Sequence, residues 1–339
     1  MPTTVNRQIT LASRPHGEPG PEHFRLVETP IPAPGPGEML LKTQWLSLDP
    51  YMRGRMSDAK SYAKPVEVGG VMVGGTVSRV VTSDVARFRA GDVVLANGGW
   101  QDYSISNGEG RAALDPATAP VQTALGVLGM PGLTAYVGLR NIGLPQPGET
   151  LVVAAAAGPV GSMVGQIGKS KGCRVVGIAG GRDKARFLTD ELGFDAGLDH
   201  RAPDFVTQIQ AACPEGIDIY FENVAGKVWE AVLPLLNNFA RVPVCGLIAN
   251  YSLTAPPEGP DRSISLMSNI LAKRLRVQGF IFWDFNEQRE DFISEASAWL
   301  RQGRIKYRED IVEGLENAPE AFMGLLKGRN FGKLLVKVS

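Results

Sequence analysis

The sequence is poor in the residues from which disulfide frameworks and metal sites are built. Among its 339 residues there are only three cysteines and three histidines. The cysteines, Cys173, Cys213 and Cys245, are odd in number, far apart and confined to the second half of the chain. That pattern makes neither a disulfide framework nor a metal-binding knuckle. We therefore predict reduced thiols, no metal ion and a cytoplasmic location.

An excess of one charge and long apolar runs are also lacking. The 35 Lys and Arg residues balance the 35 Asp and Glu residues, and no basic block stands out. Proteins that bind nucleic acids or anionic membranes usually carry such a block. No apolar run reaches the roughly 18 residues of a membrane span, and the opening MPTTVNRQITLASRPHG lacks the apolar core of a signal peptide. The expected partner is a small molecule, with neither nucleic acid nor membrane.

The amino-acid composition and the pattern of apolar residues change along the chain. Up to about residue 125, short β-prone runs alternate with turns rich in Pro and Gly, which is typical of an irregular, mostly antiparallel β domain. After that, apolar strands alternate with helical patterns, and this predicts a parallel, doubly wound sheet because parallel strands need crossover connections. The expected strands are 150–156, 174–180, 196–199, 217–223, 240–246 and 276–281.

The length, about twice that of a usual domain, also favours two domains. We predict an α/β protein with a mainly β domain over 1–125 and a nucleotide-binding domain over 126–310. The strand-like tail FGKLLVKVS belongs to a segment, 311–339, that we expect to return to the first domain. Helices are expected over 183–193, 227–238 and 287–302.

The most informative turn follows the first of these strands, in VVAAAAGPVGSMVGQIGK (152–169). It matches the G-x-G-x-x-G pattern of dinucleotide sites, with Ala156 in place of the first glycine. Gly158 would let the backbone approach a pyrophosphate, and Gly161 would let the helix pack closely on its strand. Pro159 suits a first helical turn, whose free N–H groups attract an anion. The alternative is an ordinary tight turn between a strand and a helix.

The end of the next strand bears on which nicotinamide cofactor is bound. An NAD site usually has an acidic residue there to hold the ribose 2′-OH. This strand ends at Gly180, and Arg182 and Lys184 follow within four residues. Both cations can hold a 2′-phosphate by charge-assisted hydrogen bonds, so NADP(H) is favoured. The alternative is that they are solvated charges at a helix start, with Asp183 as the N-cap or as a ligand of the 2′-OH.

The composition limits the chemistry that such a cofactor serves. Zinc-dependent alcohol dehydrogenation needs Cys and His ligands, and no cysteine precedes Cys173. No motif supports a Ser-His-Asp arrangement either. Hydride transfer remains, in which the cofactor carries the reaction and the protein supplies orientation and a proton or hydrogen bond. A tyrosine is the expected donor in a site without a metal.

Seven segments, in order along nearly the whole chain, resemble the zinc-independent medium-chain dehydrogenase/reductases. Within that family they resemble the branch of prostaglandin reductases, plant double-bond reductases and bacterial curcumin reductases. Where zinc-containing relatives have Gly-His-Glu, this chain has Gly70-Val71-Met72. The segments are LSLDPYMRGRM (46–56), GMPGLTAYVGL (129–139), AAAAGPVGSMVGQIGKSKGCRVVGIAGG (154–181), GIDIYFENVAG (216–226), CGLIANY (245–251), GFIFWD (279–284) and GRNFGKLLVKV (328–338).

The resemblance implies a GroES-like first domain, a Rossmann second domain, an active site in the cleft between them and a homodimer. It implies NADPH-dependent reduction of the carbon–carbon double bond of α,β-unsaturated ketones or aldehydes. A quinone reductase and a non-catalytic NADPH-binding protein are the alternatives. The residue arguments and the resemblance together predict these cofactor-binding residues: Met130, Thr134, Gly158, Pro159, Val160, Gly161, Ser162, Gly180, Arg182, Lys184, His200, Asn223, Cys245, Gly246, Tyr251, Phe280, Ile281, Phe282 and Asn330.

Two tyrosines are the predicted catalytic residues. Tyr251 matches the tyrosine that the family holds against the substrate carbonyl, and Tyr51 would face it from the other domain. A phenol O–H aimed at that oxygen stabilises the enolate charge that builds up during hydride transfer. The alternatives are a partly buried aromatic for Tyr251, and for Tyr51 a structural turn in which Arg53 forms an ion pair.

Some residues depart from the family pattern. His200 stands where a tyrosine is usual, and Ala225 replaces a common glycine. Pro243 is unexpected in a central strand, because proline cannot donate a ladder hydrogen bond. The segment 253–274 begins rich in proline and continues as an apolar helix, which is expected to shape the substrate pocket and border a dimer interface.

Overall fold

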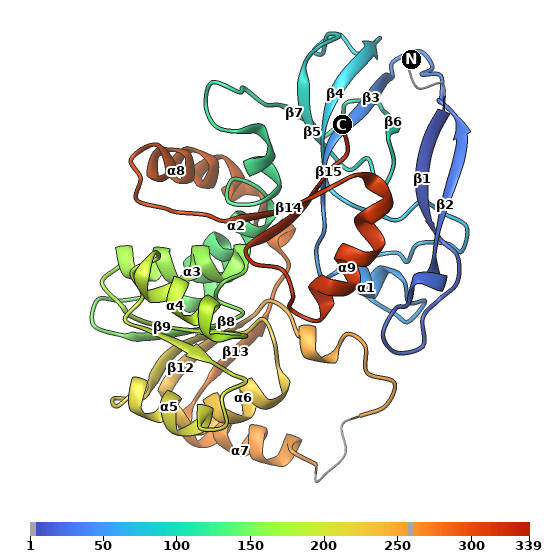
Figure 1. Ribbon diagram of the computed structural model, residues 1–339. Coiled ribbons are helices and arrows are strands. Elements are labelled where there is room, and N and C mark those ends of the chain that lie inside the picture. Colours follow the sequence, from blue (N-terminus) through green and yellow to red (C-terminus); the bar gives the residue numbers. More distant parts are fainter. Residues whose placement is uncertain (1–4, 257–260) are drawn as a thin grey trace. The chain divides into compact units, whose positions relative to one another are not determined.

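The structure is a computed structural model that describes residues 5–256 and 261–339. The chain forms two compact units (Figure 1). Unit 1 comprises residues 1–125 and 309–339, and unit 2 comprises residues 126–308. Residues 257–260, in the proline-rich part of the segment 253–274, lie outside the described residues.

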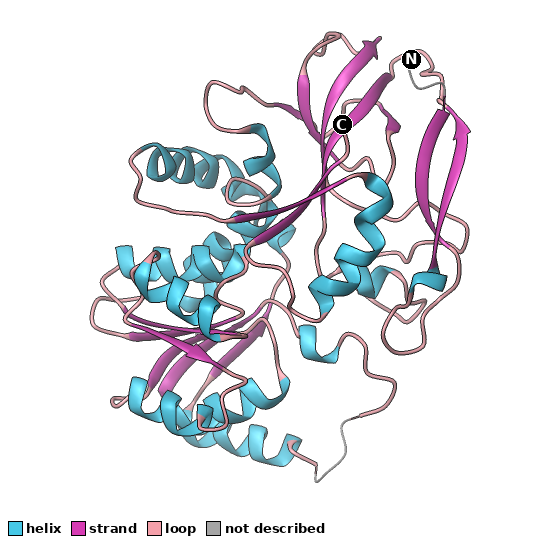
Figure 2. Ribbon diagram, in the orientation of Figure 1, coloured by secondary structure: helices cyan, strands magenta, loops and turns pink. Residues whose placement is uncertain are grey.

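Unit 2 is a doubly wound α/β unit, which confirms the predicted fold class. Its six strands are all parallel, in the order β10-β9-β8-β11-β12-β13. Helices cover both faces of this sheet, α3 and α4 on one face and α5, α6 and α7 on the other (Figures 1 and 2). The strands are β8 Thr150–Ala154, β9 Arg174–Ala179, β10 Ala196–Asp199, β11 Ile217–Phe221, β12 Leu236–Val244 and β13 Arg276–Gly279. The helices are α2 Met130–Gly138, α3 Pro159–Ser170, α4 Arg182–Asp190, α5 Phe205–Ala212, α6 Gly226–Val232, α7 Ser263–Lys273 and α8 Arg289–Arg301.

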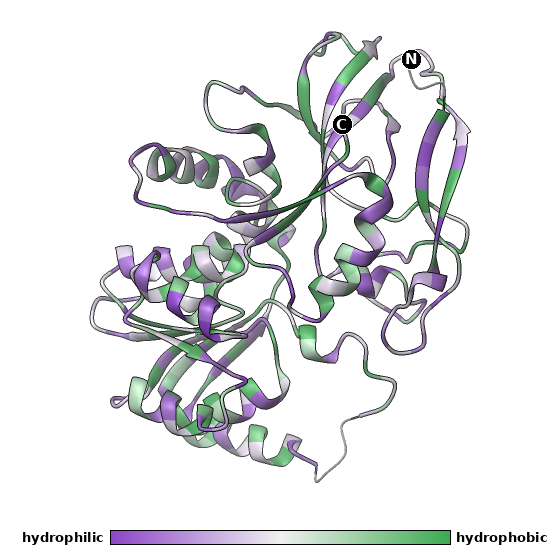
Figure 3. Cartoon of the chain, viewed as in Figure 1, coloured by the Kyte–Doolittle hydropathy of each residue, from purple (hydrophilic) through white to green (hydrophobic). Residues whose placement is uncertain are grey.

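The apolar strand sequences explain why this sheet lies inside the unit. All five residues of β8, TLVVA, are buried, because helices cover both of its faces. The strands are accordingly among the most hydrophobic segments of the unit (Figure 3). Val152, Val176 and Tyr220 from three neighbouring strands share one core cluster with Phe205 of α5. Burial of these side chains drives the packing of the helices onto the sheet.

Pro243 does lie within β12, between β11 and β13, as its position in the sequence suggested. Its carbonyl accepts a hydrogen bond from Glu222 N at 3.0 Å. The ladder between β11 and β12 is already irregular, with a register shift between Ile217 and Ile219. A missing N–H therefore costs less here than in a regular central ladder.

Unit 1 is a mostly antiparallel β unit. Its larger sheet has the order β14-β15-β3-β4-β5-β7, with β6 also paired to β3, and β1 and β2 form a separate hairpin. The C-terminal strand β15 pairs antiparallel with β3 and parallel with β14. The elements are β1 Val5–Leu11, β2 Phe24–Pro30, β3 Met39–Ser47, α1 Met52–Arg55, β4 Thr76–Ser83, β5 Val93–Ala96, β6 Tyr103–Ser106, β7 Ala112–Ala113, β14 Glu309–Glu313, α9 Ala318–Leu326 and β15 Lys333–Lys337.

Short 3-10 or π turns connect these elements in both units. They are η1 Pro21–His23, η2 Val121–Leu125, η3 Leu139–Gly143, η4 Leu233–Leu235, η5 Ile248–Asn250, η6 Phe282–Gln288 and η7 Leu315–Asn317. None of the helices in the described ranges is both long and apolar enough to cross a membrane.

An aromatic cluster and a buried ion pair hold unit 1 together. The ring of Trp100, which is fully buried, stacks on Phe24 at 5.8 Å and meets Phe322 of α9 edge-on at 5.7 Å. Lys333 of β15 donates from Nζ to Asp49 Oδ1 and to the Leu48 carbonyl, both at 2.8 Å. The side chains of this pair are only 3% and 7% exposed. A charge that is buried this deeply has to be paired.

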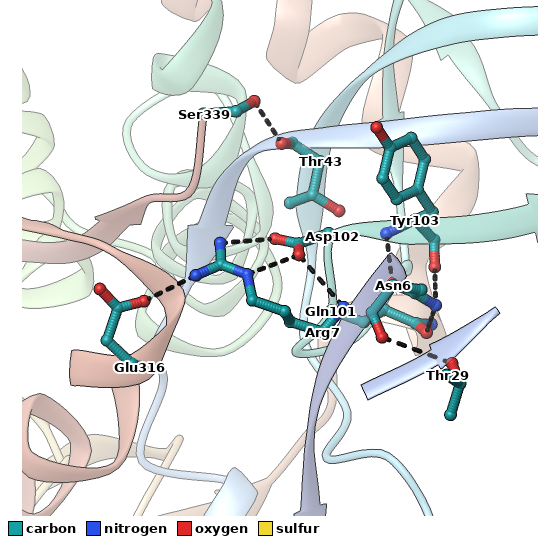
Figure 4. A network of polar contacts seen from close by, with 9 residues as sticks. All are labelled: Asn6, Arg7, Thr29, Thr43, Gln101, Asp102, Tyr103, Glu316 and Ser339. Carbon is teal, nitrogen blue, oxygen red and sulfur yellow. Dashed lines mark hydrogen bonds and ion pairs between the residues drawn. The ribbon is translucent and has the colours of Figure 1, made fainter. Parts of the chain in front are cut away.

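Polar contacts fasten the first and last described residues of unit 1 to its sheet (Figure 4). The guanidinium of Arg7 donates to both carboxylate oxygens of Asp102, at 2.8 and 3.0 Å. Asn6 and Tyr103 exchange side-chain and backbone hydrogen bonds of 3.0 and 2.8 Å. Ser339 Oγ donates to the Thr43 carbonyl at 2.8 Å. Both chain ends of the unit are thus anchored beside β3 and β6.

Candidate functional site

The candidate site of unit 2 lies at the edge of the sheet where the six parallel strands end. Parallel strands place the turns that follow them at the same edge, which is where such sheets bind ligands. Most of the predicted cofactor residues come from these turns. They are Gly158 to Ser162 after β8, Gly180, Arg182 and Lys184 after β9, His200 after β10, Asn223 after β11, Cys245, Gly246 and Tyr251 after β12, and Phe280 to Phe282 after β13.

The turn between β8 and α3 places backbone groups that no bulky side chain covers at this edge. Ala155 has a left-handed φ of 50°, and Gly158 is the N-cap of α3 with no side-chain cap. A Cβ on Gly161 would stand 2.5 Å from the Ala155 carbonyl oxygen, so no side chain fits there. Pro159 occupies the first helical turn, as predicted. The first N–H groups of the helix are left without intrahelical partners and can receive an anion.

Basic side chains, one of them a histidine, lie at the ends of β9 and β10. A Cβ on Gly180 would stand 3.1 Å from both His200 Nε2 and Arg201 Nε. Burial, together with the positive charges of Arg201 and Lys184, lowers the pKa of His200. His200 and Arg201 therefore lie beside the Gly180 backbone, and Lys184 is near enough to His200 to affect its pKa. Sequence reasoning missed Arg201, whose signal was its place directly after His200 at a strand end.

The turn beneath this cationic group is held by Asp199. Its Oδ1 accepts hydrogen bonds from Gly181 N at 2.8 Å and Arg201 N at 3.0 Å. Gly181, with a φ of 101°, is the N-cap of α4 and lacks a side-chain cap. The alternative in which Asp183 is the N-cap is therefore wrong, because Asp183 lies inside the first turn. Arg182 and Asp183 are both exposed at the start of α4.

A buried acid stands directly after the central strand β11. Glu222 is 3% exposed, and its Oε1 accepts from Val224 N at 2.6 Å, Ala225 N at 2.9 Å and Tyr220 Oη at 3.1 Å. Burial raises the pKa of Glu222. Its bonds hold Ala225 at a φ of 68°, a region that favours glycine and is strained for alanine. Sequence reasoning missed this acid, although it ends the apolar run IDIYFE.

The Glu222 turn also positions Asn223, one of the predicted cofactor residues. Asn223 Nδ2 donates to the Ala154 carbonyl at 2.8 Å, which links the ends of β11 and β8. The Asn223 carbonyl accepts from Ile248 N at 3.2 Å, and this bond ties the loop after β12 to the same turn. The ends of three neighbouring strands are thereby joined.

The loop after β12 carries Tyr251 and Cys245. The backbone N–H groups of Cys245 and Gly246 donate to the Glu222 carbonyl at 2.9 and 3.1 Å. Leu247 N donates to the Tyr251 phenol oxygen at 3.4 Å, so the ring folds back toward Gly246. Burial, together with the negative charge of Glu222, raises the pKa of Cys245 to about 12 and keeps this thiol protonated at neutral pH.

The remaining predicted residues of unit 2 belong to α2 and to the segment after β13. Thr134 Oγ1 donates to the Met130 carbonyl at 2.8 Å within α2. The buried ring of Phe280 meets Phe221 edge-on at 6.1 Å, and it also lies against Gly138 of α2. Phe280 is therefore part of the apolar support of this edge. Ile281 and Phe282 follow it at the start of η6.

Two predicted site residues, Tyr51 and Asn330, belong to unit 1. Burial, and next the charge of Asp49, raise the pKa of Tyr51, so its phenol stays protonated. Arg53 donates to the carbonyls of Gly17 at 2.7 Å and Pro15 at 3.4 Å. Within residues 5–256 and 261–339, Arg53 makes these backbone contacts and not the ion pair considered for it. Asn330 Nδ2 donates to the Gly332 carbonyl at 2.8 Å.

Comparisons with known proteins identify the family. The family model described as the N-terminal domain of oxidoreductase matches residues 7–114, and the one described as zinc-binding dehydrogenase matches residues 159–299. The chain is 58% identical to the NADPH-dependent curcumin reductase of Escherichia coli, over 98% of this chain and 97% of that protein. It is 42% identical to prostaglandin reductase 1 of Rattus norvegicus, over 97% and 98% of the two chains. The chain belongs to the medium-chain dehydrogenase/reductase family.

The crystal structure of CurA from Vibrio vulnificus in complex with NADPH is similar to this chain over nearly its whole length. It superposes with a TM-score of 0.96 at 58% identity and covers 98% of this chain and 99% of its own. The family resemblance seen in the sequence is thus confirmed. Within residues 5–256 and 261–339, no group of three or more His, Cys, Asp or Glu side chains is placed to hold a metal ion.

The buried carboxyl of this medium-chain reductase makes a testable contribution to stability. The pKa of Glu222 is raised above its ordinary value of 4.5, so its stabilising contribution is complete below that value and is lost as pH rises through the folded-state pKa. Glu222→Gln keeps an oxygen acceptor and removes this titration. We expect the stability of the variant relative to wild type to increase as the pH is raised from about 4.5 to 7, measured by urea denaturation.

Glu222→Ala serves as the contrasting variant. It removes the acceptor of three donors and should destabilise the protein by at least about 2 kcal/mol, because buried unsatisfied donors are costly. A stability difference between wild type and Glu222→Gln that does not vary with pH would contradict the assigned protonation behaviour.

Proposed function

We propose that the protein is an NADPH-dependent reductase of the carbon–carbon double bond of α,β-unsaturated ketones and aldehydes. The observation that carries this proposal is the carboxyl edge of the unit 2 sheet, where an uncapped helix start follows β8 and cations follow the next two strands, β9 and β10. A pyrophosphate fits the first feature and a 2′-phosphate fits the second. Similarity to an NADPH-dependent curcumin reductase over nearly the whole chain supports the same cofactor.

Residues of different turns would bind different parts of the cofactor. Gly158, Pro159, Val160, Gly161 and Ser162 would hold the pyrophosphate, and Gly180, Arg182, Lys184, His200 and Arg201 would surround the 2′-phosphate. When bound, the reduced nicotinamide supplies a hydride. Residues near the nicotinamide and its ribose would be Asn223, Cys245, Gly246, Tyr251, Met130, Thr134, Phe280, Ile281, Phe282 and Asn330.

Tyr251 would stabilise the charge that develops on the substrate carbonyl. A phenol O–H donated to that oxygen is worth most when the enolate forms, and it therefore raises turnover. The Leu247 N–H lies 3.4 Å from the same phenol oxygen, so the loop after β12 keeps the phenol close to its own backbone. Tyr51, kept protonated in unit 1, would be a second donor.

The reaction itself is tested by mixing the enzyme, NADPH and a panel of alkenals, benzalacetone-like enones and quinones. NADPH consumption, followed by its near-ultraviolet absorbance, should occur with the enones and alkenals. Rapid turnover of quinones with inert enones would identify a quinone reductase instead. Tight NADPH binding without turnover of any of them would indicate a non-catalytic NADPH-binding protein.

Lys184→Ala tests the cofactor assignment. Loss of a charge-assisted bond to the 2′-phosphate should weaken NADPH binding about tenfold or more, while NADH binding changes little. Isothermal titration with both cofactors measures the two dissociation constants. Lys171→Ala, at an exposed position after α3, removes the same charge as a control. Equal weakening of NADPH and NADH by Lys184→Ala would refute the phosphate contact.

Tyr251→Phe tests the role of the phenol. We expect kcat on a good enone to fall about tenfold or more, since one transition-state hydrogen bond is lost, with the NADPH dissociation constant unchanged. Steady-state kinetics and cofactor titration provide the two readouts. An unaltered kcat would remove Tyr251 from the mechanism.

The proposal includes a cytoplasmic homodimer. The exposed face of α7 carries Ile264, Met267 and Leu271, which are 70%, 63% and 79% exposed. Their spacing of three and four residues places them on one side of the helix. An exposed apolar patch of this kind marks an interface, and a second copy of the chain is the expected partner.

Leu271→Asp tests this interface. A charge in the centre of an apolar interface should shift the protein from dimer to monomer, measured by size-exclusion chromatography with light scattering. Leu26→Asp, at an exposed apolar residue of unit 1, is the control and should leave the molar mass unchanged. A wild-type protein that is monomeric at micromolar concentration would contradict the dimer.

A further inference from the structure

At the start of α6, an alanine adopts a backbone conformation that side chains avoid. Ala225, the N-cap of this helix, has a φ of 68° and a ψ of −156°. That region is populated almost only by glycine, and another residue stays there only where its surroundings force it to. Ala225 is also buried. Strain of this kind is concentrated at sites where a ligand needs a fixed backbone.

The Glu222 side chain holds Ala225 in this conformation. Its Oε1 accepts the N–H groups of Val224 at 2.6 Å and Ala225 at 2.9 Å. The hydroxyl of the fully buried Tyr220 donates to the same oxygen at 3.1 Å and thereby fixes the orientation of the carboxyl group. Without this acceptor, two buried N–H groups would lose their partner, and Ala225 would relax out of the strained conformation.

The strained turn is bonded to the loop after β12 through its backbone. The carbonyls of Asn223 and Val224 accept from Ile248 N at 3.2 Å and from Ala249 N at 3.0 Å. Val224 thus donates to the Glu222 side chain and accepts from the loop. A change in the turn is therefore transmitted to the loop that carries the predicted catalytic tyrosine.

We propose that Glu222 is a positioning residue that acts through the strained Ala225 turn on the groups of unit 2 that bind the nicotinamide half of the cofactor. These groups are Asn223, Cys245, Gly246 and Tyr251. Their contact with the cofactor rests on the proposed function, whereas the coupling between the turn and the loop does not. The residues proposed for the 2′-phosphate belong to other turns, after β9 and β10, so binding of that phosphate should not depend on Glu222.

The two halves of the cofactor separate this role from a general loss of stability. Glu222→Ala should weaken NADPH binding about tenfold or more, whereas 2′,5′-ADP, which lacks the nicotinamide, should bind within about threefold of wild type. Isothermal titration measures both affinities. The kcat on a good enone should also fall about tenfold, because the loop that carries Tyr251 moves. Glu222→Gln keeps an oxygen acceptor and should stay within about threefold of wild type in each readout.

Asp218→Ala is the matched control. Asp218 lies near the other end of the same strand, β11, where its side chain accepts from Thr150 N at 2.9 Å and from Asn237 Nδ2 at 2.8 Å. This variant also removes an acidic acceptor of a backbone N–H, but at the sheet edge opposite the candidate site. It should destabilise the protein without changing the ratio of the two affinities. Thermal unfolding of each variant checks that the fold is intact.

A second substitution tests the strain itself. Glycine adopts the Ala225 conformation without support, so Ala225→Gly removes the need for the Glu222 side chain. In the Ala225→Gly background, Glu222→Ala should weaken NADPH binding less than about threefold, against about tenfold or more in the wild-type background. Equal losses in the two backgrounds would show that the strained turn is not the link.

The remaining outcomes distinguish the positioning role from the reductase. Equal weakening of NADPH and 2′,5′-ADP by Glu222→Ala, or no weakening of either, would overturn the positioning role and leave the reductase in place. A wild type that bound NADPH but reduced no enone would overturn the proposed function alone.

Two further measurements cover the cases in which titration of Glu222→Ala gives no answer. If the wild type bound no NADPH, hydrogen exchange of residues 245–251 would decide on the coupling: faster exchange in Glu222→Ala than in Asp218→Ala supports it, and equal exchange overturns it. If Glu222→Ala did not fold, Glu222→Asp would replace it in the same comparisons, because its shorter side chain draws the acceptor away from the same donors.

Discussion

The candidate site of unit 2 depends on one constraint, which is that all six strands of its sheet run in the same direction. Turns as far apart in the chain as Gly158 and Phe280 therefore lie along one edge. The helices α3 and α4 begin at that edge, so their uncapped N–H groups lie there as well. A reversed strand would place its turn at the opposite edge and remove its residues from the site.

Two acids, the buried Glu222 and the partly exposed Asp199, stabilise the turns at this edge. Glu222 and Asp199 both use carboxylate oxygens to accept backbone N–H groups of the turns that follow β11 and β9. The side chains beside Gly180 are those of Arg201, a cation, and His200, whose lowered pKa leaves it neutral at pH 7. In the interior of unit 1, a carboxylate instead pairs with a cation: Asp49 and Lys333, 284 residues apart in sequence, form an ion pair. That pair secures the segment that leads to Tyr51.

Much of the fold could be predicted because its signals are local. The alternation of apolar strands and helical patterns predicted the parallel sheet, and the turn at 156–161 predicted both the uncapped helix start and the position of Pro159. The helix expected over 227–238 was too long: α6 ends at Val232, since Pro234 cannot continue a helix, and β12 begins at Leu236. The sequence did not indicate the bond partners of Arg53, because they come from residues 15 and 17, far from it in sequence.

The sequence by itself determined the fold class, the glycine turn and the two cations that follow β9, because backbone sterics and hydrophobic period act over a few neighbouring residues. Tertiary structure alone decided that Arg201 joins Lys184 and His200, since this requires β10 to lie beside β9. It also decided that Glu222 supports the Asn223 turn and the Tyr251 loop. Which side chains become neighbours depends on strand order and packing, and neither is encoded in any short segment.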